Sequence, residues 1–388
     1  MLYVGIDISK DDFSVCYLDP EVKKEKLPVF KYKQTKKGFE KFLSKLRSFD
    51  SEEVLAVMES TGSYHESLRA YLSDEGIQAI VLNPASVKKH MSVLSKSKTD
   101  EIDARNLAMI AHRFMETVEK SNIPQEKQLA LRELVRFREK LVKECSAYKK
   151  RLRNYLNITV PEILRQFRSM GSVVLLHLLQ EYPTKEKMLA DPEGVKELLQ
   201  SHRWKEEDAE TFLDILRESV GKKDNYGSYE RVILLSVKKI RELEEEVDAL
   251  KKDIEELLKN FPDHPAGSIP GIGTISTAII ISEIGNIFRF LSKKHFVSYV
   301  GLDPKLKQSG KRSGNTHISK QGNAYLRHVF YQIACRIIVW SDKYKALHTK
   351  MKKRGKTPKE SLVIIARKVA ELVYVITTSN STFSFDHQ

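Results

Sequence analysis

The first 115 residues alternate short apolar runs with longer amphipathic stretches. Runs rich in β-branched and aromatic residues predict β-strands at 2–9, 13–18, 28–33, 53–59 and 77–82. Apolar positions at helical spacing predict helices at 37–47, 64–75, 84–92 and 100–115. Asp11-Asp12 joins the first two strands closely, as in a hairpin, whereas the later strands alternate with helices. This order is typical of an α/β domain with a mixed sheet and crossover connections.

Residues 125–260 carry apolar residues at a seven-residue spacing, which predicts long helices. The first helix has one complete row and a second row with Arg138 as its polar member: Leu134, Leu141, Tyr148 and Tyr155, then Leu131, Cys145 and Leu152. The second helix has two complete rows: Ile233, Ile240, Val247, Ile254 and Phe261, then Leu243, Leu250 and Leu257. A coiled coil of roughly four heptads is expected, and pairing within one chain or between two chains fits equally. Prolines and Gly221 interrupt 160–228, which predicts short helices and turns there.

Residues 262–375 are predicted to form a third, mainly helical unit. Within SIPGIGTISTAIIISEIG, a tight glycine turn opens an apolar helix. This pattern indicates the hairpin of a helix-hairpin-helix element, in which the amides of Gly271 and Gly273 and the following helix N-terminus can hold a phosphate. An ordinary glycine-rich helix start has the same pattern.

The positive charge of the chain is concentrated in one segment. The 388 residues have a formal net charge of +14, and the sequence pI is about 9.3. Residues 289–360 hold 18 Lys and Arg against three acids, a net charge of +15 within this segment. Aromatic residues such as Phe296, Tyr325 and Tyr344 are interleaved with these cations. We therefore expect a nucleic-acid-binding face here rather than an ordinary solvated surface.

Hydropathy and cysteine usage narrow the class of protein further. No apolar run reaches the length of a transmembrane helix, and Asp7 interrupts the first apolar run, so neither a membrane span nor a signal peptide is expected. The three cysteines are far apart and lack metal-ligand spacing, which indicates reduced packing residues. A cytoplasmic protein is expected.

Four acidic residues in the first 103 positions are the main candidates for chemistry. Asp7 lies within the first predicted strand, and Glu59 ends the fourth. Asp100 and Asp103 are three residues apart at the start of a predicted helix, which places both on one helix face. Such a set of carboxylates favours hard divalent cations, Mg²⁺ or Mn²⁺, and two-metal carboxylate sites cleave phosphodiesters. Taken singly, each acid also fits a turn or a helix first turn.

The motifs GIDISK, MESTG, KTDEIDA, PGIG and GLDPKLKQSGKRSGNTHISKQGNAYLR together resemble the DEDD transposases of bacterial insertion sequences, the one-ten family. The resemblance covers both ends of the chain and is less diagnostic in the middle. It implies three domains: a RuvC-like, RNase H-type catalytic domain at 1–120, a helical coiled-coil dimerisation region at 121–261 and a transposase domain at 262–388. Asp7, Glu59, Asp100 and Asp103 match the family's metal-binding tetrad, and Ser309 matches its nucleophilic serine.

The resemblance also implies partners. Double-stranded DNA is the expected substrate, with nucleoid association when the protein is bound to it. A structured guide RNA that pairs with donor and target DNA is expected, as is a homodimer that assembles to a tetramer. Eight residues are assigned to nucleic-acid contact: Gly271, Gly273, Lys305, Lys307, Lys311, Arg312, Lys320 and Arg327.

The residues around Ser309 leave its role open when taken alone. Serine is a weak nucleophile without an activating base, metal or lowered pKa. The predicted loop is rich in lysine and arginine, which could stabilise a phosphoryl transition state, but it contains no neighbouring histidine or carboxylate base. A Ser-Gly pair in a basic loop is more often a turn that contacts phosphates, and Ser313 and Ser319 are equal candidates on this basis.

Three other functions are compatible with parts of the sequence. A two-metal nuclease such as a junction resolvase would use the acids with water as nucleophile. An actin-like sugar or acetate kinase shares a strand like GIDIS, but its later glycine-rich phosphate loops are missing. A non-catalytic coiled-coil scaffold would leave the four acids without a purpose.

Overall fold

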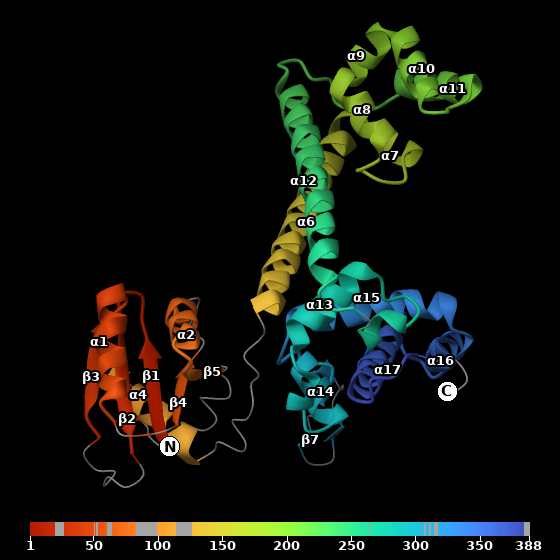
Figure 1. Cartoon of the computed structure of the whole chain (residues 1–388). Helices are drawn as coiled ribbons and strands as arrows, with labels where there is room; N and C mark the ends of the chain where they lie inside the picture. Colours follow the sequence, from red (N-terminus) through yellow and green to blue (C-terminus); the bar gives the residue numbers. More distant parts are fainter. Residues whose placement is uncertain are drawn as a thin grey trace. The chain divides into compact units, whose positions relative to one another are not determined.

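The computed structural model shows two compact units (Figure 1). It describes residues 1–19, 27–49, 51, 53–59, 64–82, 99–113, 126–262, 264–305, 308–309, 312–313 and 317–383. One unit comprises Met1–Gln125 with Gly285–His295, and the other Glu126–Ile284 with Phe296–Gln388. The predicted division into three domains stays a prediction.

The first unit is built on a five-stranded mixed sheet with strand order β3-β2-β1-β4-β5. The strands are β1 (Leu2–Ile8), β2 (Asp12–Leu18), β3 (Val29–Lys33), β4 (Val54–Glu59) and β5 (Gln78–Leu82). β1 and β2 form the predicted antiparallel hairpin, and β1, β4 and β5 are parallel neighbours. The α/β prediction is confirmed for this part of the chain.

Helices cover both faces of this sheet, which explains why its strands are apolar on both sides. On one face, Val4 and Ile6 pack with apolar residues of α1 (Lys36–Arg47) and α2 (His65–Asp74). On the other face, Val57 and Ile80 pack with Leu107 of α4 (Asp100–Arg113). The predicted helix at 84–92 lies outside the described residues.

The second unit contains two long helices, α6 (Glu126–Thr159) and α12 (Ser228–Leu258), which pack along each other within one chain (Figure 1). This is one of the two arrangements that the heptads left open. The predicted rows are buried only in part: Leu131, Cys145 and Leu152 are buried, whereas Leu134, Tyr148 and Tyr155 are half-buried. Val135 and Leu156, which belong to neither predicted row, are buried instead. The buried face of α6 therefore includes positions outside the simple heptad.

Five short helices pack as a small apolar cluster at the far end of α6 and α12 (Figure 1). They are α7 (Ile163–Gln166), α8 (Val173–Glu181), α9 (Lys185–Ala190), α10 (Pro192–Ser201) and α11 (Glu206–Arg217). Thr184 and Asp191 cap the starts of α9 and α10 through their side chains. The prediction of short helices in this stretch is confirmed.

The C-terminal part of the chain is mainly helical. It contains the 3₁₀ turns η2 (Pro265–Ser268) and η3 (Ile287–Arg289), and the helices α13 (Thr274–Ile284), α14 (Lys293–Val300), α15 (Ala324–Trp340), α16 (Asp342–Lys353) and α17 (Pro358–Thr378). α13 is buried from Ser276 to Ile284, as its apolar sequence requires, and packs against α6 and α15. Thr357 and Glu360 form a capping box that starts α17. None of the described helices is long and apolar enough to cross a membrane.

Candidate functional site

Asp7 and Glu59 lie next to each other at the carboxyl ends of two parallel strands. In the register of β1 and β4, Ile6 lies opposite Met58, and Asp7 and Glu59 are the next residue on each strand. Neighbouring strands are about 4.8 Å apart. Since Gly5 and Val57 face α4, the two-residue alternation of a strand directs Asp7 and Glu59 to that same face.

The first turn of α4 lies at the same end of the sheet. Tyr3 packs edge-on against His112 with ring centroids 5.0 Å apart, and Gly5 lies against Ala104 and Ala108. From Tyr3 to Gly5, the neighbouring residues of α4 change from His112 to Ala108 and Ala104. The strand β1 and the helix α4 are therefore antiparallel. The next residue on this face of β1, Asp7, lies toward the turn that contains Asp100 and Asp103.

The close packing of α4 on β1 depends on Gly5. A Cβ atom at this position would lie 2.1 Å from the Ala104 carbonyl oxygen and 2.2 Å from the Ala108 amide nitrogen. Such contacts are shorter than any van der Waals separation, so only glycine allows this approach. Gly5 thus fixes the distance between the strand with Asp7 and the helix with Asp100 and Asp103.

The start of α4 has a structural explanation that does not require a ligand. The Thr99 hydroxyl accepts a hydrogen bond from the Ile102 amide at 3.3 Å, and the Asp103 amide donates to the Thr99 carbonyl at 2.8 Å. Acids in a first turn also interact favourably with the helix dipole. Asp100 is exposed and Asp103 is half-buried.

The donor set fits a hard divalent cation, although the side chains do not close around one point. All four candidates offer carboxylate oxygens, the ligands that Mg²⁺ prefers. Within the described ranges, however, no three His, Cys, Asp or Glu side chains gather closely enough to hold a metal ion. Residues 60–63 and 83–98, which flank Glu59 and Thr99 in the sequence, lie outside those ranges.

Asp12 is an acid near this site whose contacts hold neighbouring strands together. Its carboxylate accepts a hydrogen bond from the Ser9 hydroxyl at 2.9 Å and forms ion pairs with Lys31 at 3.2 Å and Lys33 at 3.6 Å. Burial alone would raise the pKa of Asp12, but Ser9 and the two lysines outweigh it, so the pKa lies below its usual value of 3.8. Asp12 therefore ties β2 to β3 and is a natural reference for the four candidates.

Ser309 lies in a small β-hairpin of the second unit, where the sequence predicted a loop. β7 (Gln308–Ser309) pairs antiparallel with β8 (Arg312–Ser313), and Ser309 is directly opposite Arg312. A second antiparallel pair flanks this hairpin in the sequence: β6 (Pro304–Lys305) precedes it, and β9 (His317–Ile318) follows it. The strands have two residues each, too short for an alternating pattern to be recognised in the sequence. Lys307 and Lys311 lie outside the described residues.

Hydrogen bonds hold the base of this hairpin to the helical scaffold. The Ser319 amide donates to the Asp303 carbonyl at 2.9 Å, and the Ser319 hydroxyl donates to the Asp303 carboxylate. Ser319 therefore has a structural role at the base of the hairpin. After Gly322, the Asn323 amide donates to the Tyr299 carbonyl at 2.8 Å.

Asn323 connects the hairpin base to a buried ionic network that the sequence did not predict. Its side chain caps α15 and donates to Glu283 Oε2 at 2.7 Å. Glu283, only 1% exposed, also accepts two hydrogen bonds from the guanidinium of Arg136. The one sequence signal for this network was a single acid within the apolar helix TISTAIIISEI.

Four more predicted contact residues are described, and two have structural roles. Gly271 has a φ of +88°, and a Cβ there would lie 3.3 Å from Arg336 Cβ. Arg327 is half-buried and donates from Nη1 to the Val300 carbonyl at 3.2 Å. Gly273 borders open space, and Lys320 is exposed with a φ of +54°. Nucleic-acid contact by all of these residues stays a prediction.

Comparison with known proteins places both ends of the chain in one group. A family model for DEDD transposases of the IS110 type matches residues 4–161, and a model described as "Transposase IS116/IS110/IS902 family" matches residues 264–356. The transposase of insertion sequence element IS1111A from Coxiella burnetii is 25% identical over 98% of this chain and 90% of its own length. A pilin gene-inverting protein from Moraxella bovis is 23% identical, over 98% of this chain and 97% of its own length. An insertion element IS110 protein of 43.6 kDa from Streptomyces coelicolor is 22% identical, over 97% and 93%.

Proposed function

This chain belongs to the IS116/IS110/IS902 family of transposases, and we propose that it cuts DNA with the hydroxyl of Ser309 and a cation held by four carboxylates. Enzymes of this family cut and rejoin DNA. The observation that carries the proposal is the placement of Asp7 and Glu59 on adjacent parallel strands, on the sheet face that α4 covers with its acidic first turn.

Asp7, Glu59, Asp100 and Asp103 would hold the divalent cation that a DEDD domain implies, with Mg²⁺ or Mn²⁺ as the ion that suits carboxylate oxygens. When bound, such an ion polarises phosphoryl oxygens and stabilises the charge that develops in the transition state. The protein's own contribution would be the placement of these acids on two adjacent strands and on the first turn of α4. Gly5 supports that placement, because it lets α4 lie directly on β1.

In the proposed reaction, the Ser309 oxygen attacks the phosphorus of a DNA phosphodiester. The bond from phosphorus to the 3′ oxygen breaks, the serine proton is lost to a carboxylate or to solvent, and the leaving 3′ oxygen takes up a proton. The product is a phosphoserine ester that joins the protein to the 5′ oxygen of the downstream strand, while the upstream strand ends in a free 3′-hydroxyl. Attack by the 3′-hydroxyl of another strand on this phosphoserine restores a phosphodiester and frees the serine. One ester bond forms for each that breaks, so no external energy source is required.

The hairpin supports Ser309 as the nucleophile in two ways. Ser309 belongs to the stretch KQSGKRSGNTHISK, which lies inside the segment matched by the family model at 264–356. The backbone register pairs it with Arg312, a cationic residue, on the neighbouring strand. A cation at this position would stabilise charge on the transferred phosphoryl group.

The covalent intermediate gives the most direct test. Wild-type protein, a DNA substrate and Mg²⁺ or Mn²⁺ should give a species on denaturing gels that contains protein and DNA. Ser309→Ala should bind DNA and fold normally, because an exchange of one serine for alanine leaves the cationic residues in place, but it should form no adduct. Asp7→Asn should also lose the adduct, since the neutral amide removes charge required to hold the cation.

Two results would overturn this assignment. An adduct that persists in Ser309→Ala would move the nucleophile to another residue, with Ser313 as the next candidate. Cleavage by wild-type protein without an adduct under any trapping condition would instead indicate the two-metal nuclease that uses water.

We further propose a structured guide RNA as the source of sequence choice and a homodimer that assembles to a tetramer. The net charge of +15 in residues 289–360, without a recognised base-reading motif, supports delegation of sequence choice to base pairing. Half-buried apolar residues on the long helices, Leu250 and Val247 among them, support self-association. RNA that copurifies with the protein, and light-scattering masses in solution, would test these two partners. A protein free of RNA that still selects its DNA target would contradict the first.

A further inference from the structure

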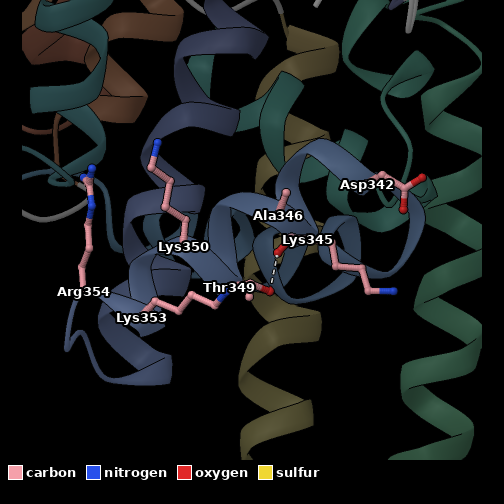
Figure 2. Close-up of a pocket in the computed structure, with 7 residues that line it drawn as sticks. All are labelled: Asp342, Lys345, Ala346, Thr349, Lys350, Lys353 and Arg354. Atoms are coloured by element: carbon pink, nitrogen blue, oxygen red, sulfur yellow. Dashed lines mark hydrogen bonds between the residues drawn. The ribbon is translucent and has the colours of Figure 1, made fainter.

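One face of α16 carries an unusual concentration of exposed cations. From residue 342 to 356 the chain has seven Lys and Arg side chains and a single acid, Asp342. A shallow surface depression on this helix is lined by residues that recur every three or four positions: Asp342, Lys345, Ala346, Thr349, Lys350, Lys353 and Arg354 (Figure 2). All seven are exposed, whereas Tyr344 faces inward and is buried.

These cations are not neutralised by neighbouring acids. Among the described residues, Lys345, Lys350, Lys353 and Arg354 form no ion pair within 4 Å, although the nearby Lys356 pairs with Glu360 at 4.0 Å. The helix dipole accounts for lysines in the last turn of α16, where a positive charge is favourable. It does not account for Lys345, which lies near the N-terminal end where a positive charge is unfavourable. The distribution therefore has no explanation in the stability of the helix alone.

We propose that this α16 face docks on the phosphate backbone of double-stranded DNA, outside the hairpin that carries Ser309. The choice of DNA rests on the function proposed above. From Lys345 to Arg354 the cations span about 14 Å along the helix axis, the length over which one duplex strand presents about four phosphates. The small residues Ala346 and Thr349 lie between them, and the Thr349 hydroxyl is directed to the Lys345 carbonyl at 3.1 Å (Figure 2).

The lining of this face favours a duplex over a single strand. None of its seven residues is aromatic, so it offers no ring on which an unpaired base could stack. Contacts from flexible lysines to phosphates carry no base information. The α16 face should therefore contribute affinity that is independent of DNA sequence and strongly dependent on salt.

The test compares two triple variants with the same change in net charge. In the first, Lys345, Lys350 and Lys353 are replaced by Gln. In the control, Lys36, Lys37 and Lys41 are replaced by Gln; these three also lie on one helix, α1, and are exposed. Binding of the full-length proteins to duplex DNA of several sequences is measured as a function of salt. The α16 variant should bind roughly tenfold or more weakly to every sequence, with a salt slope smaller by about 2 to 3, and the control should match wild type.

Further measurements separate this docking face from the chemistry and from folding. Replacement of the same three lysines by Arg should restore the affinity, and melting temperatures of all variants should agree. Ser309→Ala should keep the wild-type affinity and salt slope, so an error in the assignment of the nucleophile leaves this binding result unchanged. Equal loss in both triple variants, or unchanged binding by the α16 variant, would overturn the assignment. Loss of binding to structured RNA with duplex DNA binding intact would overturn it as well, and would make RNA the partner of α16.

Discussion

Arg136 of α6 and Glu283 of α13 form a two-pronged ion pair, with Nε to Oε1 at 2.6 Å and Nη2 to Oε2 at 2.9 Å. The residues are 147 positions apart, and the contact joins the base of the long helices to the C-terminal helices. Hydrogen bonding to Glu283 raises the pKa of Arg136 above its usual value. Because Asn323 donates to the same carboxylate, the pair also holds the start of α15, directly after the serine hairpin.

Removal of Arg136 should destabilise the second unit strongly. Arg136→Met leaves the carboxylate of Glu283 buried with Asn323 as its remaining described hydrogen-bond donor, and loss of one partner from a buried pair costs about 3–5 kcal/mol. Arg136 is itself about a third exposed, so the lower end of that range is expected. Lys239→Met, which breaks an exposed pair with Glu242, should change the free energy of unfolding much less, because solvent screens that pair. Chemical denaturation of both variants measures the difference, and equal costs would contradict a buried role for Glu283.

The sheet could be predicted from the sequence because its strands are long enough to show a pattern. The predicted bounds of β1 and β4 each differ from the observed ones at one end only, by one residue, since their β-branched runs have sharp limits. The Arg136–Glu283 pair could not be predicted, because nothing in either helix alone indicates which distant residue meets the other. The α6 seam was predicted incorrectly in part for the same reason: burial of Leu156 depends on the short helices that pack at that end, not on a partner helix alone.

Gly5→Ala should damage both stability and cleavage. The added methyl group would overlap the Ala104 carbonyl, so α4 must move away from β1, and such overpacking costs about 1–3 kcal/mol or more. The same movement separates Asp100 and Asp103 from Asp7. Gly273→Ala is the matched control for stability, because apart from its chain neighbours no described heavy atom lies within 4 Å of the position that its added methyl group would take, and the melting temperature should not change. Full cleavage activity in Gly5→Ala would show that α4 does not set the spacing of the acids.

Leu250→Glu should reduce self-association without unfolding the long helices. Leu250 is only half-buried in one chain, so its remaining apolar surface is available to a second copy, and a charge there is costly once that surface is covered. Ala249→Glu adds the same charge at the adjacent exposed position and should leave the mass unchanged. Light scattering of both variants, with melting curves, measures the effect. An unchanged mass for Leu250→Glu would favour α6 and α12 as a hairpin that serves one chain alone.

Asp12 should contribute to stability at neutral pH and lose that contribution in acid. Its pKa in the folded protein lies below the usual value of 3.8, so its stabilisation is fully present above that value and is lost as the pH falls through the lower, folded-state pKa. Asp12→Asn removes the charge that pairs with Lys31 and Lys33, and it should make unfolding less dependent on pH in the acid range below the usual value of 3.8. Urea denaturation at several pH values tests this, and parallel curves for wild type and variant would contradict it.

Asp7→Asn should abolish DNA cleavage and leave the fold nearly intact. The amide has the shape of the carboxylate but lacks the charge that a divalent cation requires. Removal of divalent ions with a chelator should stop cleavage by wild-type protein, and added Mg²⁺ or Mn²⁺ should restore it there but not in Asp7→Asn.

Asp12→Asn is the matched control, since it changes the same residue type on the adjacent strand of the hairpin but not a proposed ligand. Calorimetric titration with Mn²⁺ gives a second readout: wild type and Asp12→Asn should bind the ion, and Asp7→Asn should bind it at least roughly tenfold more weakly. Equal binding and cleavage by Asp7→Asn would remove Asp7 from the site.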